Sequence, residues 1–185
     1  MANMNTLSRS LHDVGLATWF GGTLANAVAL NPASAEAKDP ASTGAVANAG
    51  WDRWTPVNAA AIGAHLVGSL GQLAGNRERL TIQKGVASMA LAKTALTGAA
   101  LGATAYSRAL GRKVSRHGAV PADSGTQPNT FTPEDAAAAQ KKLQLLQWLV
   151  PALTGALVVV SSFAGEQQRP GQVKRGTAAR LLPAR

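Results

Sequence analysis

The sequence predicts an all-α protein, a four-helix transmembrane bundle with polar connectors and a basic, disordered tail. Residues 14–35, 55–76 and 143–165 contain no Asp, Glu, Lys or Arg, and a helix crosses the hydrocarbon core of a bilayer with about 20 such residues. Charged residues make up 15% of the 185-residue chain, against about 25% in an average soluble domain. A soluble Ala-rich helical bundle is the alternative, but a chain of this length leaves much of its surface in contact with water.

The chain contains no cysteine and has a formal net charge of +9. The lack of cysteine excludes disulfides, thiolate metal sites and cysteine catalysis. In a soluble protein this excess of cations would suggest nucleic-acid binding. Here the cations lie mostly at the ends of the uncharged segments and near the C-terminus, where anionic lipid head groups can bind them. We therefore expect the lipid bilayer as a partner and no nucleic acid.

Residues 1–165 are predicted to form a single membrane domain with four spans. The first span covers about 11–31 and ends before a proline, because the residue preceding proline disfavours the helical conformation. The connector 33–54 is rich in Ala, Ser, Gly and Asn and is expected to be an irregular loop. The second span, 55–76, opens on a Thr-Pro pair, a helix cap followed by proline at the first helical position.

The third span is predicted at about 81–106. Lys84 and Lys93 interrupt this segment, which leaves open whether it crosses the membrane. Residues 107–130 then form a polar, basic linker with three glycines and two prolines.

The fourth span covers 143–165 and extends a helix that starts in the Thr-Pro-Glu-Asp sequence of 132–135, where the cap, the proline and the two acids all favour a helix start. Pro151 lies inside this span and should kink it. Residues 166–185 are predicted to be a basic, disordered tail.

The composition and the spans together predict a multi-pass protein of a bacterial cytoplasmic membrane. Heavy use of Ala, Gly and Arg is typical of a GC-rich bacterial genome. Cations are divided almost equally between the two sides of the predicted bundle, so the positive-inside rule leaves the orientation undecided. The run Ala33-Ser34-Ala35 resembles a signal-peptidase site, which leaves open that the first span is removed.

Glycines at helical spacing are the first candidate packing features. Gly71 and Gly75 form one GxxxG pattern and Gly98 and Gly102 another. Gly15 and Gly22 lie two turns apart on the first span. In lipid, such small-residue faces let helix backbones approach closely. These glycines form either a dimerisation face or packing contacts within the bundle, and the second interpretation is favoured.

Polar residues recur on the predicted spans and are expected to point inward, because lipid offers them no hydrogen bonds. The candidates are Asn26, His65, Gln72 and Lys93. Lys93 is the most costly of them, at about 2.5–3.5 kcal/mol for a lysine at the centre of a span. It is either a functional cation, with Asp13 as its nearest acid in the predicted arrangement, or it extends its stem to the head groups.

His12 and His65 are candidate haem or metal ligands on adjacent helices. Two histidines are too few to complete a metal site, and hydrogen-bonded structural histidines are the favoured alternative. The chain carries no Walker, HExxH or Gly-x-Ser-x-Gly pattern. We therefore expect no enzymatic activity and no bound cofactor.

His12, Trp19, Gly21 and Gly22 together open an apolar helix with the pattern H-x6-W-x-G-G. This pattern resembles the first helix of small bacterial four-helix membrane proteins, including copper-resistance D-type domains and related uncharacterised families. The resemblance covers about twenty residues. It implies copper handling only distantly, because beyond His12 no functional residue of those families has a match here, and the chain has three methionines.

The leading functional prediction is a small membrane accessory or scaffold protein that associates with a larger membrane assembly, or with further copies of itself, through its Gly-rich faces. The first alternative is a permeation protein for a small solute or ion, using the inward polar residues and Lys93. The second alternative is a haem- or metal-binding redox module that uses His12 and His65.

Overall fold

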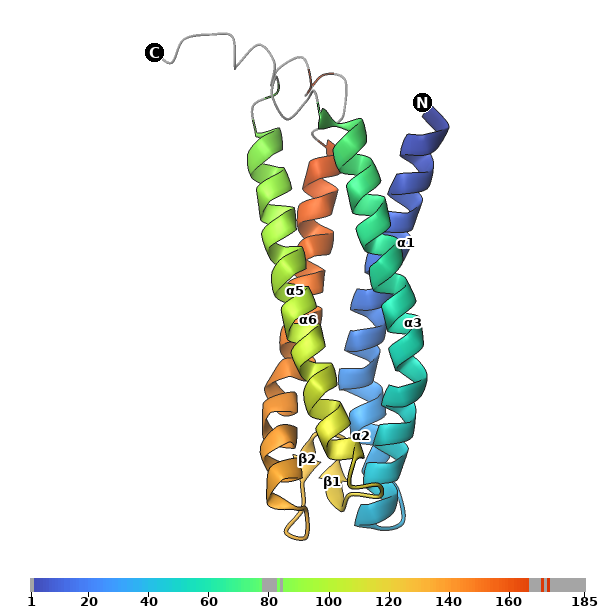
Figure 1. Cartoon of the computed structure of the whole chain (residues 1–185), viewed down its shortest axis with the longest axis vertical. Coiled ribbons are helices and arrows are strands. Elements are labelled where there is room, and N and C mark those ends of the chain that lie inside the picture. The colour runs from blue at the N-terminus through green and yellow to red at the C-terminus, as the bar shows by residue number, and fades with distance from the viewer. Residues whose placement is uncertain (1, 78–82, 84, 167–170, 172, 174–185) are drawn as a thin grey trace, which may run out of the picture.

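Within the part of the chain described by the computed structural model, residues 2–77, 83, 85–166, 171 and 173, four long helices lie side by side (Figure 1). The described start of the chain and the end of the last helix lie at one end of the bundle. A small hairpin lies at the other end. The prediction of a helical protein is confirmed, and successive long helices run in opposite directions along the bundle (Figure 1).

The first helical rod is longer than predicted. Helix α1 covers Ala2–Ala25 and continues through a π-helical turn, η1 (Asn26–Leu30), into the short helix α2 (Asn31–Ser34). Pro32 has no amide hydrogen to donate, so regular α-helical bonding cannot pass through it, and the turn before it is widened. The helix therefore begins well before residue 11 and continues through Pro32, so the prediction that it ends before this proline is wrong by a few residues. The bounds of the span itself stay a prediction.

Helix α3 covers Pro40–Gly75, so the prediction of an irregular loop over 33–54 is wrong. The side chain of Asp39 caps this helix by accepting hydrogen bonds from the backbone nitrogen and the hydroxyl of Ser42, at 2.9 and 2.7 Å. These bonds lower the pKa of Asp39. Pro40 occupies the first turn. Pro56, predicted to open a helix, lies inside this one.

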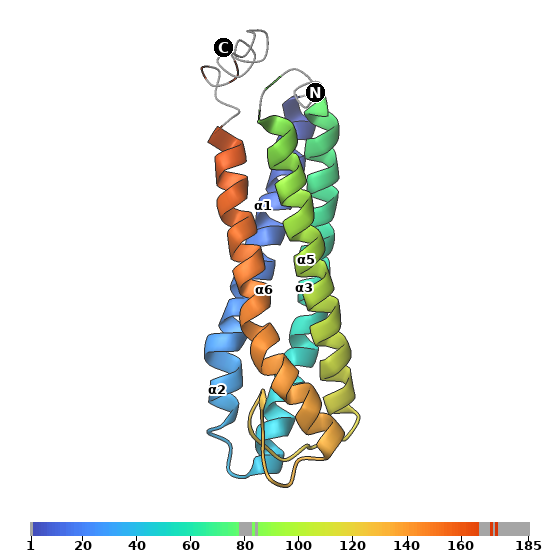
Figure 2. The same cartoon turned by 90° about the vertical axis from the view of Figure 1, so that its left-hand side faces the viewer.

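Helix α5 covers Val86–Ser115 and therefore extends well into the predicted linker. The rest of that linker contains a hairpin of two short antiparallel strands, β1 (Ala122–Ser124) and β2 (Gln127–Pro128). Helix α6 covers Glu134–Glu166 and begins with two acids in its first turn, as predicted. It contains Pro151 and bends along its length (Figure 2).

The start of α6 is tied to the end of α5. His117 lies 3.0 Å from the carboxylate of Asp135, and the ammonium of Lys113 lies 3.9 Å from it. The hydrogen bond from His117 is the main cause of a lowered pKa of Asp135. His117 is therefore paired with an acid at this end of the bundle.

The helices pack as two pairs, α1 with α3 and α5 with α6, and α1 also packs along α6. Trp19, Ala61 and Ala100 form one buried apolar cluster, to which α1, α3 and α5 each contribute. A second cluster joins α5, α6 and the hairpin end and includes Leu110 and Val120. Contact between α3 and α5 is slight, so a seam lies between these two helices.

Helices α5 and α6 are each long and apolar enough to cross a membrane. In the most apolar 18-residue windows of these helices, only 6% and 22% of the residues are buried within the chain. A core helix of a soluble protein would be mostly buried, so these helices leave an apolar surface open to lipid or to a partner. The four-span arrangement stays a prediction, because α1 and α3 do not pass the same test over their described residues.

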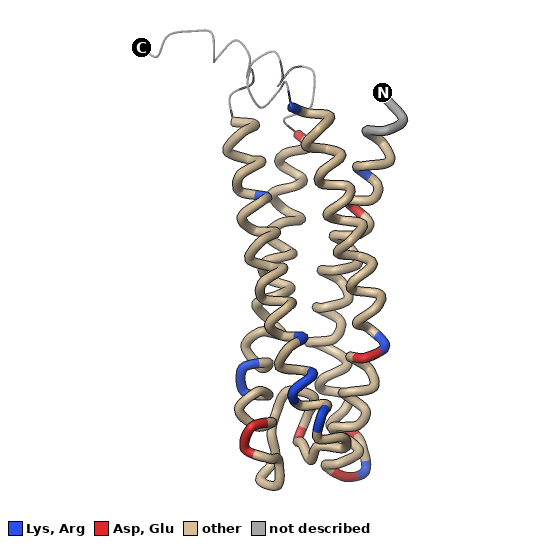
Figure 3. The backbone as a smooth tube through the Cα atoms, viewed as in Figure 1, with Lys and Arg blue, Asp and Glu red and all other residues tan. Residues whose placement is uncertain are grey.

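Charged residues gather toward the two ends of the bundle and leave an uncharged band between them (Figure 3). At 1.5 Å per residue, the uncharged stretch 143–165 of α6 is about 34 Å long, comparable to the hydrocarbon core of a bilayer at about 30 Å. Lys84 and the start of the predicted third span lie outside the described residues, as does nearly all of the predicted tail 166–185.

Candidate functional site

Helices α1 and α3 are held unusually close by glycine. A Cβ atom built on Gly15 would lie 2.5 Å from the carbonyl oxygen of Ala61 and 2.5 Å from the backbone nitrogen of His65. A Cβ on Gly68 would meet the backbone of Ser8 and His12. Each helix therefore presents a glycine to the backbone of the other, and this close crossing brings His12 and His65 together.

The rings of His12 and His65 are buried, with exposed fractions of 1% and 0%, and their centroids lie 4.6 Å apart. His12 lies 2.7 Å from Asp13 through Nδ1. Because a carboxylate only accepts, Nδ1 carries the hydrogen, and in the neutral ring Nε2 is the free acceptor. His65 lies 3.4 Å from the hydroxyl of Thr97.

The direct contact between the rings of His12 and His65 argues against the haem alternative. A haem held by both histidines would have to lie between the two rings, with one ring above and one below the iron. The rings of His12 and His65 contact each other instead, which leaves no space between them for a porphyrin. Within the described part of the chain, no group of three or more His, Cys, Asp or Glu side chains is placed to hold a metal ion.

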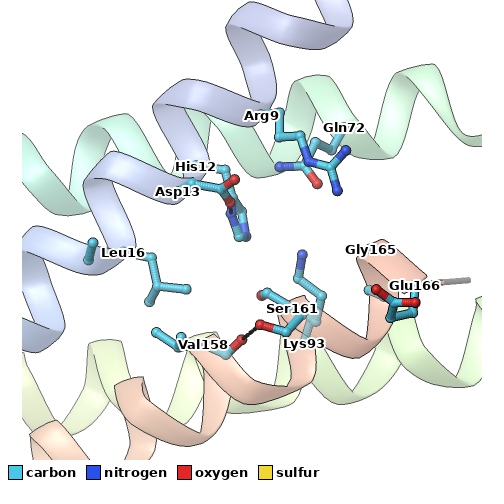
Figure 4. Close-up of a pocket in the computed structure, with 13 residues that line it drawn as sticks. Arg9, His12, Asp13, Leu16, Gln72, Lys93, Val158, Ser161, Gly165 and Glu166 are labelled. Carbon is cyan, nitrogen blue, oxygen red and sulfur yellow. Dashed lines mark hydrogen bonds and ion pairs between the residues drawn. The ribbon is translucent and has the colours of Figure 1, made fainter. Parts of the chain in front are cut away.

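A polar pocket of about 430 Å³ lies beside His12, between α1 and α6, with contributions from α3 and α5 (Figure 4). We call it the Lys93 pocket. It brings together two residues that the sequence had already linked, Lys93 and Asp13. Its polar and charged lining residues are Arg9, His12, Asp13, Gln72, Lys93, Ser161, Ser162 and Glu166.

Lys93 points into this pocket toward α1 (Figure 4). Its ammonium group makes no hydrogen bond and no ion pair within 4.0 Å to any residue that the structure describes. The carboxylate of Asp13 attracts it and the guanidinium of Arg9 repels it, both through space. Lys93 is therefore a partly buried cation without a direct partner.

Three further polar atoms of the same pocket lack a hydrogen-bond partner: Nε2 of His12, Nε2 of Gln72 and the hydroxyl oxygen of Ser161. Buried polar groups are normally hydrogen-bonded, and leaving one unpaired costs about 1–3 kcal/mol. The Lys93 pocket thus gathers an unpaired cation, two donors and one free acceptor. This combination can bind a group that carries negative oxygens and a hydroxyl.

The Lys93 pocket is closed toward the centre of the bundle. Trp19 is fully buried there and donates from Nε1 to the hydroxyl of Thr104 at 3.2 Å. Leu157 of α6 is also fully buried. The cluster of Trp19, Ala61 and Ala100 therefore fills the core of the bundle at this level, and we call it the plug.

The other predicted packing residues have different surroundings. A Cβ on Gly22 would meet the indole of Trp54, and one on Gly71 would meet the side chain of Ser8. Gly75 is exposed near the end of α3. Gly98 and Gly102 are exposed on α5, and nothing lies within 4 Å of a Cβ at either position. The favoured interpretation, that this second GxxxG pattern packs within the bundle, is therefore wrong.

Asn31 is a structural centre that sequence reasoning missed. Its amide nitrogen donates to Gln147 at 2.8 Å, and its amide oxygen accepts from Nε1 of Trp51 at 2.9 Å. Its backbone carbonyl accepts from Gly125 in the hairpin and from the hydroxyl of Ser34. The Asn-Pro pair signals only a helix end, so these partners on α3, α6 and the hairpin had no local signature. Asn26, in contrast, keeps an unpartnered amide nitrogen.

Comparison with known proteins found no matching family model, no matching curated protein and no matching solved structure.

Proposed function

We propose that this chain is a small, multi-pass, non-enzymatic protein of a bacterial cytoplasmic membrane that binds a phosphate group in the Lys93 pocket. Support for a membrane setting comes from the exposed apolar surfaces of α5 and α6 and from the uncharged band between the charged ends. The observation that carries the binding proposal is the unpaired ammonium of Lys93 among three other unpartnered polar atoms.

Phosphate fits the chemistry of the pocket better than a carboxylate does. Lys93 and Arg9 supply positive charge, and Gln72 and Ser161 supply hydrogen-bond donors, all of which suit negatively charged oxygens. The acids Asp13 and Glu166 also line the pocket, and Asp13 is hydrogen-bonded to His12. Nε2 of His12 is an acceptor when Nδ1 donates to Asp13. A hydrogen phosphate has an O–H for this acceptor, and a lipid head group of the glycerol type offers a hydroxyl beside its phosphate. A carboxylate has no such donor.

The depth of the pocket agrees with a ligand near the head groups. Lys93 lies about 10 Å along α5 from Val86, at 1.5 Å per residue. In a membrane-spanning bundle whose α5 begins at the head groups, the four-carbon stem of Lys93 allows its ammonium group to reach toward them from this depth. Both free phosphate and the phosphate of an anionic lipid can reach this depth.

The experiment measures binding to protein purified in a mild, uncharged detergent. Isothermal titration with inorganic phosphate tests the free ion, and native mass spectrometry after exchange into phosphatidylglycerol or phosphatidylcholine nanodiscs tests the lipid. Lys93→Gln should weaken the binding about 10- to 100-fold, because a hydrogen bond to a charged group contributes about 1.5–3 kcal/mol.

The matched control is Lys141→Gln, which removes the same charge from an exposed position on α6 outside the pocket. It should leave the affinity unchanged. Retention of phosphatidylglycerol without any response to inorganic phosphate would assign the site to lipid, and the reverse would assign it to the free ion. Equal binding by the Lys93 and Lys141 variants would refute the proposal.

A second function, association with another membrane protein or a second copy, is favoured by the outward face of α5. Leu91, Ala95, Gly98 and Gly102 follow one another at helical spacing, and all are exposed. Gly98→Leu should abolish co-purification of a partner or a dimer in mild detergent, because a bulky side chain prevents close backbone approach. Gly63→Leu, at an exposed glycine of α3 with nothing within 4 Å, is the control; equal effects of the two changes would exclude this face.

A further inference from the structure

A second pocket, of about 290 Å³, lies on the opposite side of the plug from the Lys93 pocket. It occupies the seam between α3 and α5 and is closed on its other sides by α6 and the hairpin turn. We call it the seam pocket. Its volume of about 290 Å³ lies just below the usual range for small-molecule sites, about 300–1,000 Å³.

The walls of the seam pocket are mostly apolar. They include Trp51, Trp54, Ile62, Leu101, Leu146 and Val150. Aromatic and branched aliphatic side chains of this kind bind an apolar molecule by removing its surface from water or by close packing. Contact between α3 and α5 is slight, so, in the membrane setting proposed above, a ligand dissolved in the bilayer has a route to the pocket between these two helices that avoids the plug.

Two polar atoms of the lining residues lack partners. Nε1 of Trp54 is a buried N–H donor without an acceptor, and Oδ1 of Asn58 is a buried acceptor without a donor. Asn58 as a whole is only 9% exposed. Two other indoles of the bundle, those of Trp19 and Trp51, do have acceptors, Thr104 and Asn31. A donor and an acceptor without partners thus lie one turn apart on α3, both on residues that line the seam pocket.

We infer that the seam pocket binds a membrane-soluble alcohol, an apolar molecule with one hydroxyl group. A hydroxyl both donates and accepts, so one such group can satisfy Asn58 and Trp54 together. An alkane would fill the same apolar walls but would leave both atoms unpaired. A charged ligand would have to be desolvated against walls in which Arg108 is already paired with Asp52 at 3.1 Å.

The test uses two probes that differ by one hydroxyl, 10-bromo-1-decanol and 1-bromodecane. Bromine quenches tryptophan emission on contact, and Trp51 and Trp54 line the pocket. The background variant Trp148→Phe removes the exposed indole of α6. For each probe we measure the mole fraction in detergent at which quenching is half its maximum. This mole fraction should be roughly 3- to 10-fold lower for the bromoalcohol than for the bromoalkane, because the hydroxyl adds about one net hydrogen bond.

Asn58→Leu should remove this preference and bring the ratio of the two half-quenching mole fractions to about one. Asn26→Leu is the matched control: it removes an amide that is also unpartnered but lies outside the pocket, and it should leave the ratio unchanged. Trp54→Phe, read through Trp51, repeats the test by removing the donor while keeping an aromatic ring. Circular dichroism checks that each variant is helical.

Equal half-quenching mole fractions of the two probes on the unmodified pocket would overturn the inference. So would an equal loss of preference in the Asn58 and Asn26 variants. Because neither Asn58 nor Trp54 belongs to the Lys93 pocket, these outcomes do not depend on whether phosphate binds there.

Discussion

Replacing Gly15 by alanine should destabilise the bundle, whereas the same change at Gly98 should not. A methyl group on Gly15 would lie 2.5 Å from the carbonyl oxygen of Ala61 and from the backbone nitrogen of His65. Both neighbours are backbone atoms, which cannot rotate away as a side chain can. The helices would have to separate, and overpacking of this kind costs about 1–3 kcal/mol.

The magnitude follows from two opposing effects. Alanine is favoured over glycine inside a helix by about 1 kcal/mol. At Gly15 the upper part of the overpacking range applies, so the net loss in the free energy of unfolding is about 2 kcal/mol. At Gly98 nothing lies within 4 Å of the new methyl group, so a gain of up to about 1 kcal/mol remains. The two variants should differ by about 3 kcal/mol.

Reversible unfolding in mixed micelles, with the mole fraction of sodium dodecyl sulfate as the variable and helical circular dichroism as the signal, measures this difference. Gly68→Ala should behave like Gly15→Ala, because its methyl group would meet the backbone of His12 and Ser8. If Gly15→Ala and Gly98→Ala gave equal unfolding free energies, the close crossing of α1 and α3 would not be a source of stability and the reasoning would fail.

Three further predictions concern Asn31, Asp135 and the membrane setting. Asn31→Leu should lower the free energy of unfolding by about 2–4 kcal/mol, since it leaves Gln147 and the indole of Trp51 without their partner; a loss below 1 kcal/mol in the same micelle assay would contradict the role of Asn31. The lowered pKa of Asp135, caused mainly by the hydrogen bond from His117, stabilises the fold above the ordinary carboxyl pKa of about 4. This contribution should be lost as pH falls through the lowered value, and an unchanged acid limb in Asp135→Asn would refute it. The chain should sediment with membranes after alkaline carbonate washing, and recovery in the supernatant would exclude the integral membrane assignment.

The sequence was sufficient to predict the helical class and the approximate centres of the long helices, because uncharged length is a local property. It failed at the start of α3, where Asp39 and Pro40 form the same cap-and-proline signal as the Thr-Pro pair at 55–56. The sequence offers two equivalent starts, and only packing selects the earlier one. Proline at 56 is then accommodated inside the helix.

The candidate site was predictable only residue by residue. Lys93 was identified by its cost in lipid, and His12 and His65 by their chemistry, but their positions depend on the rotation of each helix about its axis. Two glycines on α1 and α3 set that rotation for the histidines. Asn58 and Trp54 carried no signal for a pocket, because the missing partners become evident only when all neighbouring side chains are placed.

The close crossing of α1 and α3 bears on both pockets. Gly15 and Gly68 draw α3 onto α1 so closely that backbone meets backbone, while α5 is held mainly by α6. Four helices of similar width cannot all be in such close contact with both neighbours, so the α3–α5 seam stays open and is filled only at the plug around Trp19. The seam pocket, bordered by tryptophans and aliphatic side chains, lies in this seam. The Lys93 pocket, bordered by charged residues, lies on the other side of the plug and mainly between α1 and α6. A substitution that loosens the glycine crossing should therefore weaken ligand binding in both pockets, although neither Gly15 nor Gly68 lines either of them.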